Sequence, residues 1–196
     1  MTLLVDTPPG EDGLVVLRCG LWGYNAIGVV SGDEACAVDP GITPEEIATL
    51  RTALEAGGRR VTHVLLTHSH HDHIRGWDRF PGARVWLPAA AQDKPEKAKQ
   101  RDLAFKQAID ERLGVPDPTS VFPHSDDAFE ERARFEVGEL EVDLRFLPGH
   151  SLCTSVAFVP ALRTLISADY LVSPGLPYCR WRPRAFEQAM RTLRAW

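Results

Sequence analysis

Residues 67–73 read Thr-His-Ser-His-His-Asp-His and directly follow an apolar run. The run predicts a strand buried on both faces, so the histidines stand at a strand end. In extended backbone, residues two apart point the same way, which brings His68, His70 and Asp72 together while His73 begins a turn. Imidazole nitrogens and a carboxylate in one small volume suit zinc or iron. This stretch therefore predicts a metal site.

A chance histidine-rich surface tract is the alternative interpretation. Four of the seven histidines fall inside this stretch, directly after an apolar strand, which favours the metal site. By strand alternation His71 points away from the others and is expected to be exposed. His63 begins the strand and is expected at the surface or just outside the site.

Composition limits the remaining possibilities. The chain has 196 residues, enough for one domain, and 22 Lys and Arg against 27 Asp and Glu leave a net charge of −5. That sign disfavours nucleic acid as a partner. No apolar run approaches the roughly 20 residues of a membrane helix, and residues 1–10 lack the features of a signal peptide. We expect a cytoplasmic protein without a membrane partner. The four cysteines show no metal or disulfide spacing and are expected to be buried, reduced thiols.

Apolar runs bounded by turn residues predict the strands. They fall at 14–19, 26–30, 35–38, 61–67, 84–87, 135–137, 140–146, 155–159 and 164–167.

Four helices are expected between and after these strands. The first is capped by Thr43, with Pro44 in its first turn and Glu46 three residues after the cap, and Gly57 stops it. A short helix is expected near Trp77. The two longest are expected at 93–113, with a solvated charged face, and at 183–196. The inner faces are predicted to be Ala104, Phe105, Ala108, Ile109 and Leu113 in the former, and Ala185, Phe186, Ala189, Met190 and Leu193 in the latter.

The element order repeats one α+β theme in each half of the chain. A strand meander, a helix, a strand and helices are followed by a second meander and a helix. This order predicts two packed sheets with helices outside.

The motif His-x-His-x-Asp-His after an apolar strand resembles the signature of the metallo-β-lactamase superfamily. Three further stretches resemble its other motifs in order: Val-Asp-Pro-Gly at 38–41, Pro-Gly-His-Ser at 148–151 and Ser-Ala-Asp at 167–169. The resemblance covers about residues 25–196. It implies a four-layer αββα sandwich of two mixed β-sheets with outer helices.

The resemblance also implies a role for each motif residue. His68, His70 and His150 would hold a first metal ion, Asp72 and His73 a second, and Asp169 would lie between them. Asp39 would be structural, beside the site. The implied cofactor is one or two zinc ions, with iron also suitable. Asp72 would be the catalytic group that orients, or takes a proton from, a metal-activated hydroxide. Cys153 is expected to be a small buried residue rather than a soft ligand.

One family feature is missing, because the family's last histidine would follow the helix at 183–196. Three explanations stay open: the single domain 1–196 is truncated and lacks its last strand, the second site is weak or empty, or His124 or another group substitutes. Truncation is the interpretation that we favour, because it also explains an exposed sheet edge.

The resemblance implies a hydrolase acting on a small-molecule ester, thioester, lactone or lactam. The segments 89–123 and 173–183 are expected to shape the pocket, the second through Tyr178, Arg180, Trp181 and Arg182. An ordinary connection covering the core is the alternative for that loop. A mononuclear iron oxidoreductase resembling persulfide dioxygenases and a non-catalytic, metal-stabilised remnant are the two other functions considered. Metal content and oxygen consumption would separate them.

Overall fold

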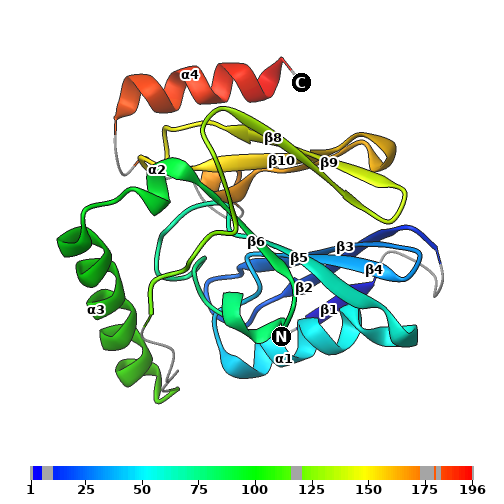
Figure 1. Ribbon diagram of the computed structural model, residues 1–196. Helices are drawn as coiled ribbons and strands as arrows, with labels where there is room; N and C mark the ends of the chain where they lie inside the picture. Colours follow the sequence, from blue (N-terminus) through cyan, green and yellow to red (C-terminus); the bar gives the residue numbers. More distant parts are fainter. Residues whose placement is uncertain (1, 6–10, 116–120, 173–178, 180–181, 196) are drawn as a thin grey trace.

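Two β-sheets lie face to face between outer helices in the computed structural model, which describes residues 2–5, 11–115, 121–172, 179 and 182–195 (Figure 1). The first sheet has seven strands in the order β1-β2-β3-β4-β5-β6-β7 and the second has the order β11-β10-β9-β8. The first sheet comprises β1 (Thr2–Val5), β2 (Gly13–Arg18), β3 (Asn25–Ser31), β4 (Glu34–Val38), β5 (Arg60–Leu65), β6 (Arg84–Pro88) and β7 (Asp127–Phe129). The second comprises β8 (Arg132–Val137), β9 (Leu140–Phe146), β10 (Ser155–Val159) and β11 (Thr164–Ile166).

The layered architecture confirms the fold expected from the sequence. The first sheet is mixed, with antiparallel pairing from β1 to β4 and parallel pairing from β4 to β7. The four described strands of the second sheet differ from the expected mixed pattern, since all of them pair antiparallel. The short connections β8–β9 and β10–β11 account for this, because a tight hairpin joins only antiparallel strands.

Helix α1 (Pro44–Leu54) covers the outer face of the seven-stranded sheet and begins as predicted. Thr43 accepts a hydrogen bond from the backbone N–H of Glu46, whose carboxylate in turn accepts from the backbone N–H of Thr43. This capping box satisfies donors that a helix start leaves unpaired. Gly28 permits the close approach of α1, because a Cβ there would lie 2.1 Å from Cδ2 of Leu54.

The predicted helix at 93–113 is wrong in its start and in its inner face. The structure has a separate short α2 (Ala89–Gln92) and then α3 (Glu96–Leu113), which starts after Pro95. The buried positions of α3 are Leu103, Lys106 and Asp110, whereas Phe105 of the predicted stripe is 49% exposed. Two charged residues of α3 face inward because Asp110 pairs with the buried Arg75 and Lys106 pairs with Asp110. These two residues are exceptions to the predicted solvated face, because the other charged residues of the helix include the exposed Glu96, Lys97, Arg101, Glu111 and Arg112.

Helix α4 (Pro183–Arg194) covers the outer face of the four-stranded sheet and has the inner face that the sequence predicts. Ala189 is buried, and Phe186, Met190 and Leu193 pack with it against Val156 of β10. Short 3-10 helices complete the described elements: η1 (Ala56–Gly58), η2 (Trp77–Arg79) near the predicted short helix, η3 (Pro160–Leu162) and η4 (Ala168–Tyr170).

The space between the sheets is filled by a second apolar core that includes His63. Its ring stacks on Phe135 of β8, with centroids 4.5 Å apart, and lies 6.2 Å from the ring of Trp86. The expected place of His63 at the surface or next to the metal site is therefore wrong. The rings of Trp86 and Phe135 also stack on each other, with centroids 5.0 Å apart, so the imidazole belongs to a cluster of three rings. Burial lowers the pKa of His63.

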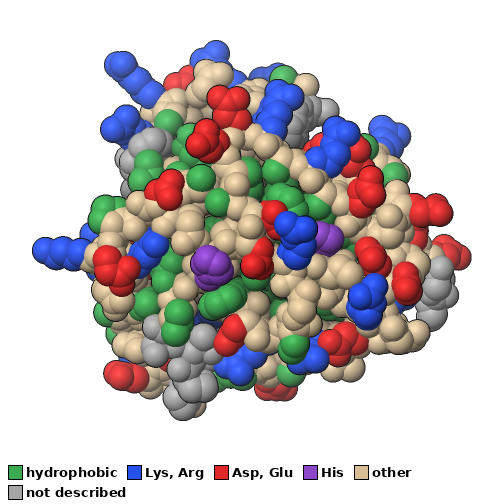
Figure 2. All heavy atoms as spheres, viewed as in Figure 1, with side chains coloured by type: hydrophobic (Ala, Val, Ile, Leu, Met, Phe, Trp, Pro, Cys, Tyr) green, Lys and Arg blue, Asp and Glu red, His purple; other side chains and the backbone are tan. Residues whose placement is uncertain are grey.

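The surface and the cysteines complete the description. On the face shown in Figure 2, acidic and basic side chains are interspersed and do not gather into an area of one sign. None of the described helices combines the length and the apolar character needed to span a bilayer. Cys19, Cys36 and Cys153 are buried free thiols, as expected, but Cys179 is exposed.

Candidate metal centre

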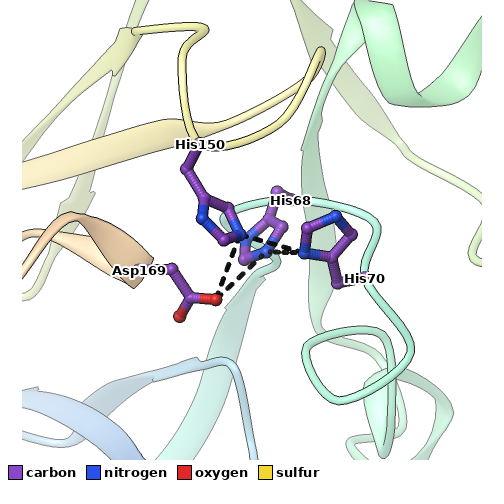
Figure 3. A group of neighbouring side chains, drawn as sticks. All are labelled: His68, His70, His150 and Asp169. Atoms are coloured by element: carbon purple, nitrogen blue, oxygen red, sulfur yellow. Dashed lines mark hydrogen bonds and ion pairs between the residues drawn. The ribbon is translucent and has the colours of Figure 1, made fainter. Parts of the chain in front are cut away.

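Four side chains from both sheets meet at one edge of the sandwich. His68 and His70 follow β5 of the seven-stranded sheet, His150 lies between β9 and β10, and Asp169 lies in η4 directly after β11 (Figure 3). One ligand atom from each lies within 4.8 Å of the ligand atoms of the others. The two sheets are joined beside them, because Ser155 at the start of β10 donates to the carbonyl of Thr67 from both its N–H and its hydroxyl.

The distances within this group fit the coordination sphere of a small ion. His70 Nδ1 lies 2.9 Å from Nε2 of His68 and 3.0 Å from Nε2 of His150. Asp169 Oδ2 lies 3.1 Å from Nε2 of His150 and 3.8 Å from Nε2 of His68. Ligand atoms of a tetrahedral zinc ion with bonds of 2.0–2.1 Å are about 3.3 Å apart. Three imidazoles and one carboxylate are also a chemically suitable donor set.

Asp39 fixes the orientation of two histidines from below the site. It follows β4 in the left-handed region, at φ 45°, and its carboxylate accepts hydrogen bonds from the N–H (2.8 Å) and the hydroxyl (2.7 Å) of Thr67. That hydroxyl lies 3.0 Å from Nδ1 of His68 and, because it donates its own hydrogen to Asp39, accepts a hydrogen bond from Nδ1–H. Since Nδ1 of His68 is then the donor, its Nε2 lone pair faces the other ligands. Asp39 thus has the structural position expected for it.

His73 and Asp72 form a second, smaller group beside the first. Nδ1 of His73 lies 2.8 Å from the carboxylate of Asp39, which leaves its Nε2 to face inward. This Nε2 lies 3.1 Å from Oδ1 of Asp169 and 3.8 Å from Oδ2 of Asp72. It is buried and has no hydrogen-bond partner among the described groups. A buried nitrogen without a partner next to two carboxylates fits a second cation, with Asp169 adjacent to both groups.

Tyr170 joins the two loops that come from the four-stranded sheet. Its hydroxyl accepts a hydrogen bond from the backbone N–H of His150 (3.2 Å) and donates to the carbonyl of Leu147. Tyr170 immediately follows Asp169, so one buried phenol sets His150 and Asp169 relative to each other. Gly149 is required at this contact, because a Cβ there would lie 2.7 Å from Oη of Tyr170.

Electrostatics in the cluster keep the carboxylate charged and His68 neutral. Burial and the neighbouring histidines His73 and His70 hold the pKa of His68 well below its usual value. Burial alone would raise the pKa of Asp169, but His73 and His150 outweigh it and hold that pKa well below the usual range. Burial opposes the charged form of His73 too, yet Asp39 and the other carboxylates raise its pKa. Neutral imidazole and ionised carboxylate are the forms that bind metal.

A cavity of about 720 Å³ opens beside the second group. Asp72, His73 and Asp169 line it, together with residues of the β2–β3 connection and of the segment after β11. His68, His70 and His150 are not among its lining residues. The four-residue group therefore lies deeper than the cavity, and Asp169 belongs to both.

The other predicted site residues have mixed outcomes. The prediction that His71 is exposed is wrong, because its side chain is only 11% exposed. Its ring packs edge-on against the rings of Trp22 and Phe105, with centroids 5.7 Å and 4.8 Å away. Cys153 is buried, as expected, 3.1 Å from the hydroxyl of Ser69. His124 is exposed and lies outside the four-residue group. Tyr178, Arg180 and Trp181 fall outside the described residues, and the described Arg182 is exposed at the start of α4.

Several residues that shape the site were not identified from the sequence. Thr67 and Tyr170 are direct chain neighbours of His68 and Asp169, so adjacency to a ligand was the only available signal. Arg75 had no such signal. It donates from Nε to the carbonyl of His71 (3.0 Å) and from Nη1 to the carbonyl of Ile42 (3.1 Å) and to Asp110 of α3.

Comparison with known proteins agrees with this geometry. The sequence profile of a family described as the metallo-beta-lactamase superfamily matches residues 19–195. A hydroxyacylglutathione hydrolase of Jannaschia sp. (strain CCS1) is 28% identical over 148 residues, which are 74% of this chain and 45% of that protein. A hydroxyacylglutathione hydrolase of Methylobacterium nodulans is 35% identical over 80 residues, 39% of this chain and 31% of that protein. The chain thus spans less than half the length of these relatives.

Solved structures share the fold at low sequence identity. A metallo-beta-lactamase from Pontibacter korlensis superposes with a TM-score of 0.67 at 14% identity, covering 99% of this chain and 86% of that one. The protein TTHA1623, solved in a di-iron-bound form, superposes with a TM-score of 0.67 at 22% identity, covering 92% and 85%. The cluster of three histidines and one aspartate supports a divalent metal.

Proposed function

Because this chain belongs to the metallo-beta-lactamase superfamily, we propose that it is a zinc-dependent hydrolase that cleaves a small acyl substrate, with a thioester as the first candidate. The thioester is favoured because both curated relatives are named hydroxyacylglutathione hydrolase. Esters, lactones and lactams are the other bonds open to the same chemistry.

The observation that carries the proposal is the meeting of His68, His70, His150 and Asp169. Residues 68 and 169 are far apart in the sequence, so the fold, and not local sequence, brings these four side chains together. His68 and His150 are buried, with 0% and 1% exposure, although imidazoles usually remain in contact with water. Burial of several polar rings at one point is costly unless they bind something there.

The proposal assigns each residue a role. His68, His70 and His150 would hold one divalent ion, Asp72 and His73 would hold a second, and Asp169 would contact both. Such ions, when bound, lower the pKa of a coordinated water and polarise the carbonyl that the water attacks. Asp39 keeps His73 and, through Thr67, His68 in the tautomers that present Nε2. Asp72, which lines the cavity, would orient the attacking water and accept its proton.

Elemental analysis of the purified chain combined with a substrate panel tests the proposal. We expect zinc at one to two equivalents and hydrolysis of at least one thioester. His68→Ala and Asp169→Ala should lose metal and turnover together, whereas Asp143→Asn on the outer face of the second sheet should keep both. Turnover retained by His68→Ala would contradict the assignment.

A second candidate is a single-iron oxidoreductase of the persulfide-dioxygenase type. The observation that favours it is the difference between the two groups, since only the first brings together four side chains. One equivalent of iron, with oxygen consumed in the presence of a persulfide and no thioester cleavage, would select this function. Bound metal without either reaction would instead indicate a metal-stabilised, non-catalytic domain. The location of either enzyme is proposed to be the cytoplasm, which cell fractionation tests.

A further inference from the structure

One arginine, Arg18, lies among the described residues that line the cavity beside Asp169. Among the described residues that line it, Arg18 is the only Lys or Arg, while Asp39, Asp72 and Asp169 are acidic. The guanidinium of Arg18 makes no hydrogen bond or ion pair with any other described residue. A guanidinium that lines a cavity without a protein partner is available to a ligand.

Strand register places Arg18 on the face of the sheet that the cavity occupies. Arg18 at the end of β2 is the direct partner of Asn25 at the start of β3. Directly opposite residues share a face, and alternation along β2 puts Arg18 on the same side as Leu14, which packs between the two sheets. Arg18 and Asn25 therefore stand together at the open edge of this space, and both line the cavity.

The turn that follows β2 holds the guanidinium in the cavity wall. The backbone N–H of Tyr24 donates to the carbonyl of Leu21 (3.3 Å), and the two residues between them have positive φ, 57° at Trp22 and 64° at Gly23. A Cβ on Gly23 would lie 3.5 Å from Nη2 of Arg18. The guanidinium therefore lies against this turn at van der Waals distance, and the positive φ at residue 23 is what favours a glycine there.

The backbone of this turn is strained at Trp22, which has a positive φ. A bulky side chain in the left-handed region is strained, and such strain concentrates at ligand sites. Its indole is 58% exposed, packs edge-on against His71 and also lines the cavity. The turn therefore places an apolar ring and a cation in one wall, which together suit an amphiphilic ligand with an anionic group.

We infer that Arg18, assisted by Asn25, binds a carboxylate of the substrate, so that the hydrolysed compound is an acyl derivative with a carboxylate distant from the cleaved bond. The inference rests on the proposed hydrolase function and names its substrate class. A guanidinium and a carboxylate match in charge and in two parallel hydrogen bonds, and the amide of Asn25 offers another donor. The volume of about 720 Å³ falls in the usual range for a small ligand.

Binding of a substrate analogue that cannot be hydrolysed tests the carboxylate site without turnover. The probe is a thioether acid in which a methylene replaces the thioester carbonyl, and its methyl ester is the uncharged control. By calorimetry on the metal-loaded chain we expect the acid to bind about 10- to 100-fold more tightly than the ester. In Arg18→Gln the ratio should fall to about one, and in the matched control Arg101→Gln, an exposed arginine of α3, it should be unchanged.

Two outcomes would overturn the inference: equal affinity of acid and ester for the wild-type chain, or a preference for the acid that survives in Arg18→Gln. Added salt should reduce the preference, because the pair is partly open to solvent. Turnover is then measured with the corresponding thioester acid and thioester methyl ester. If the binding preference is present but neither thioester is cleaved, the proposed hydrolase function fails while the carboxylate site stands. If both thioesters are cleaved equally and the acid and its methyl ester bind equally well, the carboxylate site fails while the proposed hydrolase function stands.

Discussion

Arg75 and Asp110 form an ion pair in which the two side chains are only 1% and 5% exposed. Arg75 lies two residues after His73, and Asp110 lies on α3. Nζ of Lys106 contacts the same carboxylate at 2.9 Å, so one anion is shared by two buried cations. Helix α3 is thereby attached to the turn that carries the candidate ligands.

Removing this anion should strongly destabilise the chain. In Asp110→Ala the buried Arg75 and Lys106 lose the carboxylate that they share, and we expect the free energy of unfolding to fall by about 3–5 kcal/mol in urea titrations. The matched control is Asp127→Ala, whose pair with the 62% exposed Arg84 should contribute less than about 1 kcal/mol. An equal loss of unfolding free energy in the two variants would show that burial does not make the Arg75–Asp110 pair more important for stability than the exposed pair.

Substitution of Gly149 should weaken metal binding through the backbone of His150. The added methyl group of Gly149→Ala would lie 2.7 Å from Oη of Tyr170 and 2.9 Å from Cα of Phe186 in α4. The turn has to move, so we expect the metal dissociation constant to rise about tenfold or more in competition with a chelator. Gly32→Ala, which meets nothing within 4 Å, is the control and should leave that constant unchanged.

Asp39→Asn should weaken metal binding although it removes no proposed ligand. One carboxylate oxygen becomes an amide nitrogen, which cannot accept the hydrogen bonds that Asp39 now takes from the Thr67 hydroxyl and from His73 Nδ1. We expect metal affinity to drop about 10- to 100-fold, with far-UV circular dichroism unchanged. Wild-type affinity in this variant would show that Asp39 does not orient the histidines.

Stability should depend on pH through His63, away from the metal centre. Burial between the sheets lowers its pKa in the folded state, while the unfolded chain titrates near 6.5. The unfolded state therefore takes up the proton first. The contribution of His63 is complete above about pH 6.5 and is lost as the pH falls toward the folded-state pKa.

The variant His63→Phe keeps a ring against Phe135 and removes the titration. Urea unfolding of the metal-saturated chain between pH 8 and pH 5 should show a smaller loss of stability in the variant than in the wild type. Parallel curves would mean that His63 does not contribute to the pH dependence.

Local patterns predicted much of the fold correctly. Alternation and turn residues located nine of the eleven described strands, missing β1 and β7. The Thr43 and Glu46 capping box gave the start of α1. These signals depend only on near neighbours in the chain. The inner face of α3 was wrong for the opposite reason. Asp110 faces inward because it pairs with Arg75, a partner distant in sequence that no periodicity reveals, and Lys106 faces inward because it pairs with Asp110.

In the candidate site, too, local signals were correct and contacts between distant segments were missed. Family motifs named the residues that the structure brings together, but strand alternation placed Asp72 with His68 and His70. The strand ends at Leu65 and the chain turns at 71–73, so Asp72 lies with His73 instead. His71 is covered rather than exposed because Trp22 and Phe105 come from distant segments. Tertiary contacts of this kind leave no local trace.

The four-residue group takes two members from each sheet, since His68 and His70 leave β5 whereas His150 and Asp169 follow β9 and β11. A cation held by all four would tie together the first and second halves of the polypeptide. Its arrival should therefore slow amide hydrogen exchange in both sheets at once, and its loss should let the two sheets open independently. The fraction of chains with a bound cation would then determine how cooperatively the two sheets open, and the same hydrogen-exchange experiment would measure both quantities.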